Sequence, residues 1–457
     1  MRRAVRGGAA ARRARLGGVW LTARGVVFVV ASGIALIAAY ALGLRVLLTA
    51  AIMLAALPLG AMLLVRSHRP KLSVTRSFSP HVIEAGSAAT VTLLVRNLGG
   101  SATLRAQWWD ERPWGDGHTT EAELPVLQPR GARFSRRGNS TTLEYELRPP
   151  RRGIFPIGPF SVRMSDAFGL ATSTFSLGEP QDVVVTPEVV TLAETGLSVS
   201  AGDGESRLVQ RRSAGDDDDS ITREYRTGDA MRRVHWRATA RHGDLMVRQE
   251  EQRSFPEARV LVDTRGIGYG DLYGDDRTND FDSDSFEWAV RMLASVAVHL
   301  RRYGFLVTVE ETGTPQIDLD DSAQRTWHDE VFLSDLAALR LTTAADAELV
   351  DFHDSEKGRG SNGPIIAIVG MPDHDMVEWM LRRRRPGDLA VAFLVQSTSS
   401  LDALDRTFGA HTGSVLPNAT ELLADAGWVV IPVGSDDDHA AAWEAVVFET
   451  GRSRVGS

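Results

Sequence analysis

A short segment in the middle of the chain concentrates charged side chains that could bind an anion or transfer a proton. Residues 223–251 contain seven arginines, two histidines and five carboxylates around Trp236. A guanidinium presents its donors in a plane that suits a phosphate or a carboxylate, and a histidine can act as a general acid or base near neutral pH. Three interpretations therefore stand: internal ion pairs, a surface for an acidic partner or phosphate, and an acid–base catalytic site.

The local pattern predicts that a strand, a helix and a second strand position these side chains. Residues 220–225 are typical of a short strand, Asp229 is placed to cap a helix over about 230–241, and residues 245–248 return as a strand. Arginines spaced four apart share one face of a helix. The candidate partner-binding residues are Arg232, Arg233, Arg237 and Arg241.

The other distinctive residues of this segment are interpreted as structural. Gly228 would permit the turn before the helix, Asp229 would cap it, and Trp236 would pack against a neighbouring module. No nucleophile is evident beside His235 or His242, so no catalytic residue is assigned. The structural residues comprise Arg223, Tyr225, Gly228, Asp229, Trp236, Thr239 and Ala240.

Composition and spacing argue against several other kinds of site. Cysteine is absent, which excludes disulfides, zinc–thiolate sites and a thiol nucleophile. The net charge of −8 argues against non-specific binding to nucleic acid. Residues 266–271 suggest a dinucleotide loop, but no helix is predicted to follow. Residues 280–285 begin like a calcium loop without its glycine, so Asp284 or Ser285 is instead predicted to cap the next helix. No cofactor is expected.

Two uncharged segments near the N-terminus predict a transmembrane hairpin. Residues 26–44 and 46–65 are each long enough to cross a hydrocarbon core of roughly 30 Å, and Arg45 separates them at the turn. Arginines precede and follow the pair, which places both flanks in the cytoplasm by the positive-inside rule. A cleaved signal peptide is the alternative. We expect a multi-pass protein of the cell membrane whose basic tail, residues 1–25, contacts lipid.

The rest of the chain divides into a β-rich part and an alternating α/β part. Residues 71–190 contain short strands bounded by Gly, Pro and Asn, which predicts an immunoglobulin-like β-sandwich. Trp108, Trp109 and Trp114 are interpreted as caps of its core rather than a ligand platform. Residues 255–450 alternate buried strands with helices, which predicts a doubly wound parallel sheet. A linker is predicted at 191–219, before the charged segment at 220–254.

Two runs of residues resemble the bacterial family known as domain of unknown function 58. The pattern combines an Arg-Gly-aromatic run, a Gly-Pro and an Asp-x-Phe-Gly-Leu with a later arginine-rich run around a tryptophan. The first run places it on Arg152, Gly153, Phe155, Gly158, Pro159, Asp166, Phe168, Gly169 and Leu170. The second places it on Arg223, Tyr225, Gly228, Asp229, Arg232, Trp236, Thr239, Ala240 and Arg241.

The resemblance implies that the α/β part is a von Willebrand factor A-like domain. That fold often holds a divalent ion through an Asp-x-Ser-x-Ser motif after its first strand, but here Asp263 is followed by Arg265 and Ile267. Asp373 could still face the site, and the Arg265 guanidinium could take the cation's place beside Asp263. We therefore expect a degenerate site near Asp263 and no metal.

These features together favour a membrane-anchored scaffold or adaptor facing the cytoplasm. The resemblance implies a MoxR-type AAA+ ATPase as partner, with transglutaminase-like membrane proteins as further candidates, in envelope assembly or a stress response. The alternative is an enzyme that handles phosphate esters or nucleotides through the arginine-rich segment.

Overall fold

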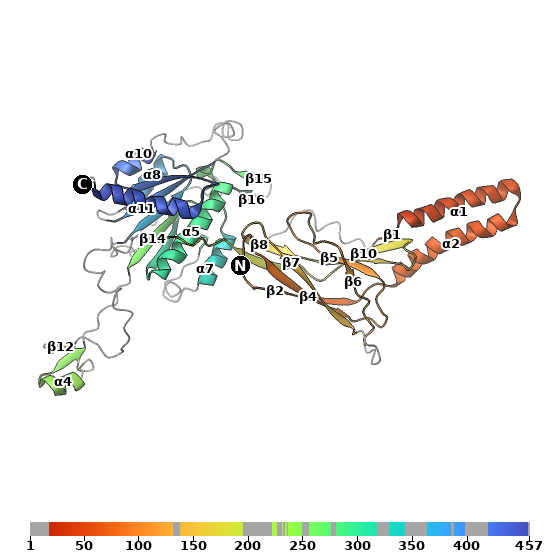
Figure 1. Cartoon of the computed structure of the whole chain (residues 1–457), viewed down its shortest axis with the longest axis horizontal. Helices are drawn as coiled ribbons and strands as arrows, with labels where there is room; N and C mark the ends of the chain where they lie inside the picture. Colours follow the sequence, from red (N-terminus) through yellow and green to blue (C-terminus); the bar gives the residue numbers. More distant parts are fainter. Residues whose placement is uncertain are drawn as a thin grey trace. The chain divides into compact units, whose positions relative to one another are not determined.

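The computed structural model describes most of the chain in two compact units. The described residues are 18–130, 138–194, 222–225, 231, 234, 236–248, 256–275, 280–317, 329–342, 363–384, 388–397 and 419–455. The first unit is Met1–Glu188 and the second is Val189–Ser457 (Figure 1).

The two apolar segments form paired helices, α1 (Ala23–Leu42) and α2 (Arg45–Ser67). Thr22 caps α1 by accepting the Gly25 N–H at 3.2 Å. Gly43, with φ of 68°, ends α1 in a left-handed conformation that glycine adopts without strain. Both helices are long and apolar enough to cross a membrane. Large apolar side chains such as Val27, Ile37 and Leu63 are exposed along them, as lipid-facing residues would be.

The rest of the first unit is built from strands, most of which share one core. The strands are β1 (Val19–Leu21), β2 (Leu72–Ser79), β3 (Ile83–Glu84), β4 (Ala89–Asn97), β5 (Ala106–Asp110), β6 (Ala122–Leu124), β7 (Ser140–Leu147), β8 (Gly153–Ile157), β9 (Phe160–Ser165), β10 (Ala171–Leu177) and β11 (Gln181–Thr186). Among the described residues they form the sheets β1-β10-β9-β5-β6, β2-β4-β7 and β3-β11-β8. On β4 the residues Val91, Leu93 and Val95 are fully buried and alternate with exposed or half-buried ones, which places one face of the strand in the core.

Three tryptophans of the strand-built part, Trp108, Trp109 and Trp114, pack at its core, as predicted. Trp108 and Trp109 are buried and Trp114 is half-buried. Trp108 stacks on Phe160 with ring centroids 5.6 Å apart, and Trp114 meets Phe155 edge-on at 5.2 Å. These rings pack against protein and do not form an open stacking platform.

The second unit contains a parallel sheet, as the alternating pattern predicted. Its strands are β14 (Glu257–Val262), β17 (Leu306–Glu311), β18 (Ile365–Val369), β19 (Ala390–Gln396) and β20 (Val429–Gly434). They lie in the order β17-β14-β18-β19-β20, with every neighbouring pair parallel. One face carries the core that includes α5 (Asp284–Arg302), α7 (Asp329–Ala338) and α11 (His439–Val455). The other packs against α8 (His374–Arg383) and α10 (Ala419–Asp425).

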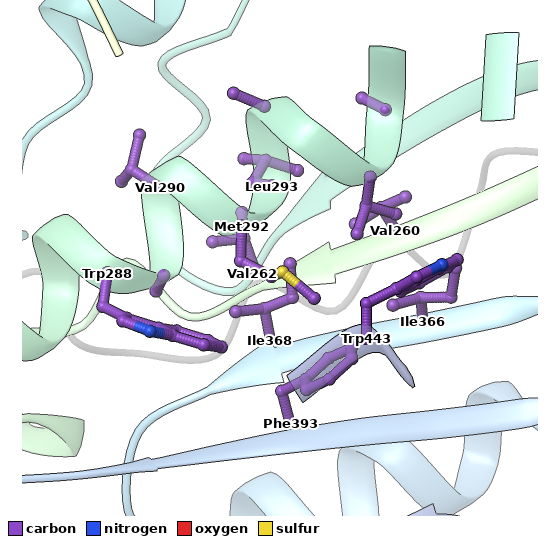
Figure 2. Packing of buried hydrophobic residues seen from close by; sticks show 14 of the residues in the cluster. Val260, Val262, Trp288, Val290, Met292, Leu293, Ile366, Ile368, Phe393 and Trp443 are labelled. Carbon is purple, nitrogen blue, oxygen red and sulfur yellow. The ribbon is translucent and has the colours of Figure 1, made fainter. Parts of the chain in front are cut away.

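Alternate residues of β14, β18 and β19 supply these two cores. Figure 2 shows Val260, Val262, Ile366, Ile368 and Phe393 of the sheet packed with Trp288, Met292 and Trp443 of the helices. Leu261, between Val260 and Val262, belongs to the core on the opposite face. Helices therefore cover both faces of the sheet, so its carboxyl edge is where a ligand crevice can form.

Three local predictions differ from the structure. Residues 19–21, assigned to the basic tail, form β1, which pairs antiparallel with β10 and so depends on a distant partner. Helix α5 is capped by Ser283, whose Oγ accepts the Phe286 N–H at 3.0 Å, and not by Asp284 or Ser285. The first residues of the predicted linker pack onto the second unit: Leu192 is buried, and Trp443 donates its indole N–H to Ala193 O at 2.9 Å.

Candidate functional site

Two aspartates lie at the carboxyl edge of the parallel sheet, where the strand order reverses. Asp263 directly follows β14, and Asp373 caps α8 just after β18. Strands β14 and β18 are neighbours, while the chain reaches β17 on the other side of β14 before it returns to β18. In open α/β sheets, ligands bind in the crevice at such a switch point. The edge around Asp263 is therefore the place in this unit to look for a site.

The side chain of Arg265 occupies this place and pairs with both aspartates. Its Nε lies 3.1 Å from Asp263 Oδ1, and its Nη1 lies 3.4 Å from Asp373 Oδ2. Arg265 and Asp263 are buried, with side-chain exposures of 3% and 0%, whereas Asp373 is 21% exposed. Burial alone would lower the pKa of Arg265, but the two carboxylates outweigh it and raise that pKa above its ordinary value. The predicted pairing of Arg265 with Asp263 is confirmed.

The Asp263 carboxylate is enclosed by further partners. Its Oδ1 accepts the Thr312 hydroxyl at 2.6 Å and the Arg265 backbone N–H at 3.1 Å. An added Cβ on Gly268 would lie 2.5 Å from Asp263 Oδ2, so the backbone approaches the carboxylate closely at a position where only glycine fits without movement. Tyr269 donates its hydroxyl to Asp263 O at 2.8 Å, and burial together with the charge of Asp263 raises the pKa of Tyr269.

These residues do not fit a divalent cation. Magnesium and calcium require several oxygen ligands around one point. Here the guanidinium of Arg265 bonds both carboxylates that would hold the ion, and the Ile267 side chain is apolar and 44% exposed. The arrangement can neutralise two negative charges at the sheet edge and hold the loops after β14 and β18 together.

Several contributors to this cluster were not identified from the sequence. Thr312 follows the neighbouring strand β17, so only the strand order brings it to Asp263. Asp271 accepts the Ser283 hydroxyl at 2.5 Å and the Ser285 N–H at 2.9 Å, which ties the loop after β14 to the start of α5. The position of Thr312 directly after a predicted strand could have indicated that it lies near Asp263, because the carboxyl ends of parallel strands share one edge of the sheet.

The charged segment folds as a small hairpin with a helix, close to the predicted order. Strand β12 (Thr222–Glu224) pairs antiparallel with β13 (Met246–Arg248), and α4 (Trp236–His242) lies between them in sequence. The Thr239 hydroxyl accepts the Met246 N–H at 3.0 Å, and the Tyr225 N–H bonds Leu245 O at 2.7 Å. Val234 and Val247 are buried. The Thr239 hydroxyl and the Tyr225 backbone N–H thus help to hold this hairpin together.

One expectation for this segment is corrected: helix α4 begins at Trp236 and not near residue 230. Trp236 is 65% exposed, so the described part of the hairpin does not bury it, and its packing against a neighbouring module stays a prediction. The buried positions of the hairpin are filled by Val234, Met246 and Val247, and a two-stranded hairpin offers little further area to cover an indole.

The arginines assigned to partner binding are described only in part. Arg241 is exposed on α4, as is Ala240. Arg223 lies on β12 opposite Val247, and Arg237 lies on α4. Outside the described residues lie Gly228, Asp229, Arg232, Arg233 and His235, as do the side chains of Arg223, Arg237 and His242.

Comparison with known proteins gives limited structural likeness. The CARDB domain of the PF1109 protein from Pyrococcus furiosus is 19% identical, covering 25% of this chain and 88% of that chain with a TM-score of 0.18. A beta-glucosidase from Listeria innocua is 13% identical over 26% of this chain and 17% of its own, with a TM-score of 0.17. The DNA glycosylase AlkC of Pseudomonas fluorescens is 11% identical over 27% of this chain and 32% of its own, with a TM-score of 0.16.

None of these likenesses carries a functional argument, because their TM-scores are low. No curated protein matches this chain. Residues 221–279 match the model of the family described as "Protein of unknown function DUF58". That range contains both the arginine-rich hairpin and the Asp263–Arg265 cluster, and the match supports a relationship of this chain to the DUF58 family.

Proposed function

We propose that this chain is a membrane-anchored scaffold or adaptor whose folded parts face the cytoplasm. In this proposal the helices α1 and α2 fix the chain in the bilayer, and the second unit presents binding surfaces to a partner. The observation that carries the proposal is the helix pair itself, which is long, apolar and exposed along most of its length.

The orientation is argued from the charged flanks of the hairpin. Seven arginines and no acidic residue lie in the first 25 residues. Arg66 lies in the last turn of α2, and Arg69 and Lys71 follow that helix. Basic residues close to membrane spans remain on the cytoplasmic side. The short turn at Gly43 and Leu44 would then lie on the outer side, and the N-terminus and both folded parts would lie in the cytoplasm.

The form of the second unit supports binding in preference to catalysis. The parallel sheet is consistent with a von Willebrand factor A-like domain, and the strand-built part of the first unit with an immunoglobulin-like module. At the switch point of the sheet, where an enzyme of this architecture would hold its ligand, Arg265 neutralises Asp263 and Asp373. A degenerate domain of this kind can serve as a rigid platform.

The partner-binding surface is assigned to the arginine-rich hairpin, residues 222–248. Arg241 and the indole of Trp236 are exposed on α4, and Arg237 lies on the same helix. Tryptophan and arginine dominate the residues whose loss weakens protein interfaces. We assign a MoxR-type AAA+ ATPase as the partner and a role in envelope assembly or stress response, with a transglutaminase-like membrane protein as a further partner. These assignments rest on the family resemblance.

Charge reversal on the hairpin tests this assignment. The tagged full chain would be crosslinked in native membranes and captured, and the ATPase in the eluate would be quantified. The Arg233→Glu and Arg237→Glu double variant should lose the ATPase, because two attractions become repulsions. The matched control changes Arg96 and Arg130 to Glu, two exposed arginines of the first unit, and should retain it. Equal capture by both variants would refute the assignment, and unfolding of the double variant would show that these arginines are internal braces.

The second candidate is an enzyme that acts on a phosphate ester or nucleotide. The density of arginines in residues 223–251 favours it, since guanidinium groups bind phosphate in a bidentate manner. Turnover of phosphorylated substrates by the purified chain, abolished by the same double variant, would favour the enzyme over the adaptor.

A further inference from the structure

The loop between β9 and β10 has a backbone held in place by one buried side chain. Asp166 Oδ2 accepts the Phe168 N–H at 2.8 Å, and its Oδ1 accepts the N–H groups of Leu170 and Ala171 at 2.7 Å each. Gly169 adopts a positive φ of 67° within this turn. The loop therefore has a defined shape, and the direction of the Phe168 side chain follows from it.

This loop is joined directly to the start of α1. The Thr22 N–H bonds Leu170 O at 2.9 Å, and the Thr22 hydroxyl bonds Gly169 O at 2.6 Å. One turn into the helix, an added Cβ on Gly25 would lie 2.2 Å from Leu170 O. The contact is thus backbone against backbone, at a distance that only glycine permits.

The same loop also contacts the end of α2. Ala61 and Val65 form a small apolar cluster with Leu170 and Ala171. The loop of residues 166–170 consequently lies where α1 begins and the last turns of α2 pass (Figure 1), and an added Cβ on Gly169 would lie 3.8 Å from Arg24 Nη1.

Two large aromatic side chains are exposed at this junction. Phe168 is 69% exposed and Trp20 is 71% exposed, although the backbone on both sides of each is hydrogen-bonded. Trp20 lies on β1 opposite Thr172, two residues before the helix cap Thr22. A single exposed apolar residue needs no explanation. Two aromatic residues held beside the start of one apolar helix lie where the surface of a bilayer crossed by that helix would be.

We propose that Phe168 and Trp20 insert into the headgroup region of the bilayer that α1 and α2 span. Aromatic residues gather at this depth because their rings are apolar while the region is partly polar. Phe168 and Trp20 lie next to the exposed apolar surface of α1, and Val26 is the first residue of that surface. The loop 166–170 would then be a second membrane contact, and it would limit how far the strand-built part can tilt relative to the helices α1 and α2. This inference rests on the proposed membrane insertion of α1 and α2.

The absence of cysteine allows a direct test of depth. Single-cysteine variants Phe168→Cys and Trp20→Cys of the full chain would carry an environment-sensitive fluorophore in lipid nanodiscs. Nanodiscs with a nitroxide on the lipid headgroup would be compared with nanodiscs that carry it at the end of the acyl chain. Ile34→Cys, at an exposed position in α1, reports on insertion of the helix, and Ile154→Cys, at an exposed position on β8, reports on water.

The proposal expects emission at positions 168 and 20 to be lost mainly with the headgroup nitroxide, emission at 34 mainly with the acyl-chain nitroxide, and emission at 154 with neither. Quenching at 34 without quenching at 168 and 20 would overturn the aromatic contact and leave the membrane anchor standing. Lack of quenching at 34 would overturn membrane insertion and the contact with it. Because the protein is purified, a protein partner cannot mimic the lipid signal.

Discussion

The guanidinium of Arg265 lies against the carboxylate of Asp263, with Nε 3.1 Å from Oδ1, at the carboxyl edge of the parallel sheet. Both side chains are almost completely buried, and Thr312 supplies a further hydrogen bond to Asp263. Removing one partner of such a buried pair destabilises the folded protein strongly, because the remaining charge is left buried without a partner.

Removal of the guanidinium should therefore be costly. We predict that Arg265→Met lowers the free energy of unfolding by about 3–5 kcal/mol, because Asp263 loses its buried partner. Chemical unfolding of the full chain in detergent measures this change. The double variant Arg265→Met with Asp263→Leu should recover much of the loss. Arg382→Met is the matched control, since its side chain is 59% exposed, and it should change little. Equal effects of the two single substitutions would contradict the role given to Arg265.

The same pair should prevent tight binding of a divalent cation. Calorimetric titration of the full chain with magnesium or manganese should show no binding with micromolar affinity, because Arg265 bonds the carboxylates of both Asp263 and Asp373. The site would have to be reinterpreted if such binding were found and then lost in Asp263→Ala.

Two glycines of α1 provide a matched test of the junction. An alanine at Gly25 would place its Cβ 2.2 Å from Leu170 O, so Gly25→Ala should destabilise the first unit by about 1–3 kcal/mol. At Gly33 an added Cβ meets nothing within 4 Å, so Gly33→Ala should be neutral or stabilise the helix by up to about 1 kcal/mol. Thermal unfolding in the same detergent compares them. If both variants melt alike, the close approach of α1 to the loop is not maintained.

The stability of the second unit should depend on pH through His439. Burial lowers the pKa of His439 to about 4, and its ring stacks on Trp288 at 4.5 Å. The unfolded chain takes up this proton more readily, with a pKa near 6.5, so the contribution is present above about pH 6.5 and is lost as pH falls toward 4. The loss is roughly 3 kcal/mol, since each unit corresponds to about 1.4 kcal/mol. His439→Phe should show a smaller fall in stability than the wild type over this range. The same fall in both proteins would exclude His439 as its source.

Much of the architecture could be predicted because it depends on the spacing of apolar and charged residues that are close in sequence. Residues 284–302 carry apolar residues at helical spacing, and helix α5 buries them, among them Phe286, Leu293 and Leu300. Pairing of Arg265 with Asp263 was predicted from residues two positions apart. Interactions that depend on distant partners were not predicted: β1 exists by pairing with β10, and Thr312 reaches Asp263 through the order of the strands.

The charged segment shows a second reason why sequence reasoning was incomplete. An amphipathic pattern indicates which residues prefer burial, but it does not say how much area the neighbouring elements offer. Trp236 was predicted to pack against a neighbouring module, and within the described residues it is exposed on a helix of seven residues that the two-stranded hairpin does not cover.

The most direct measurement of the central claim is the side of the membrane on which each part lies. Leu44→Cys, at an exposed position in the turn of the hairpin, and Leu94→Cys, at an exposed position on β4, would each be the only cysteine of the chain. Spheroplasts would be treated with a membrane-impermeant maleimide before and after lysis. A cytoplasm-facing scaffold predicts that position 44 is labelled in intact spheroplasts and position 94 only after lysis. Labelling of position 94 in intact spheroplasts would contradict the account.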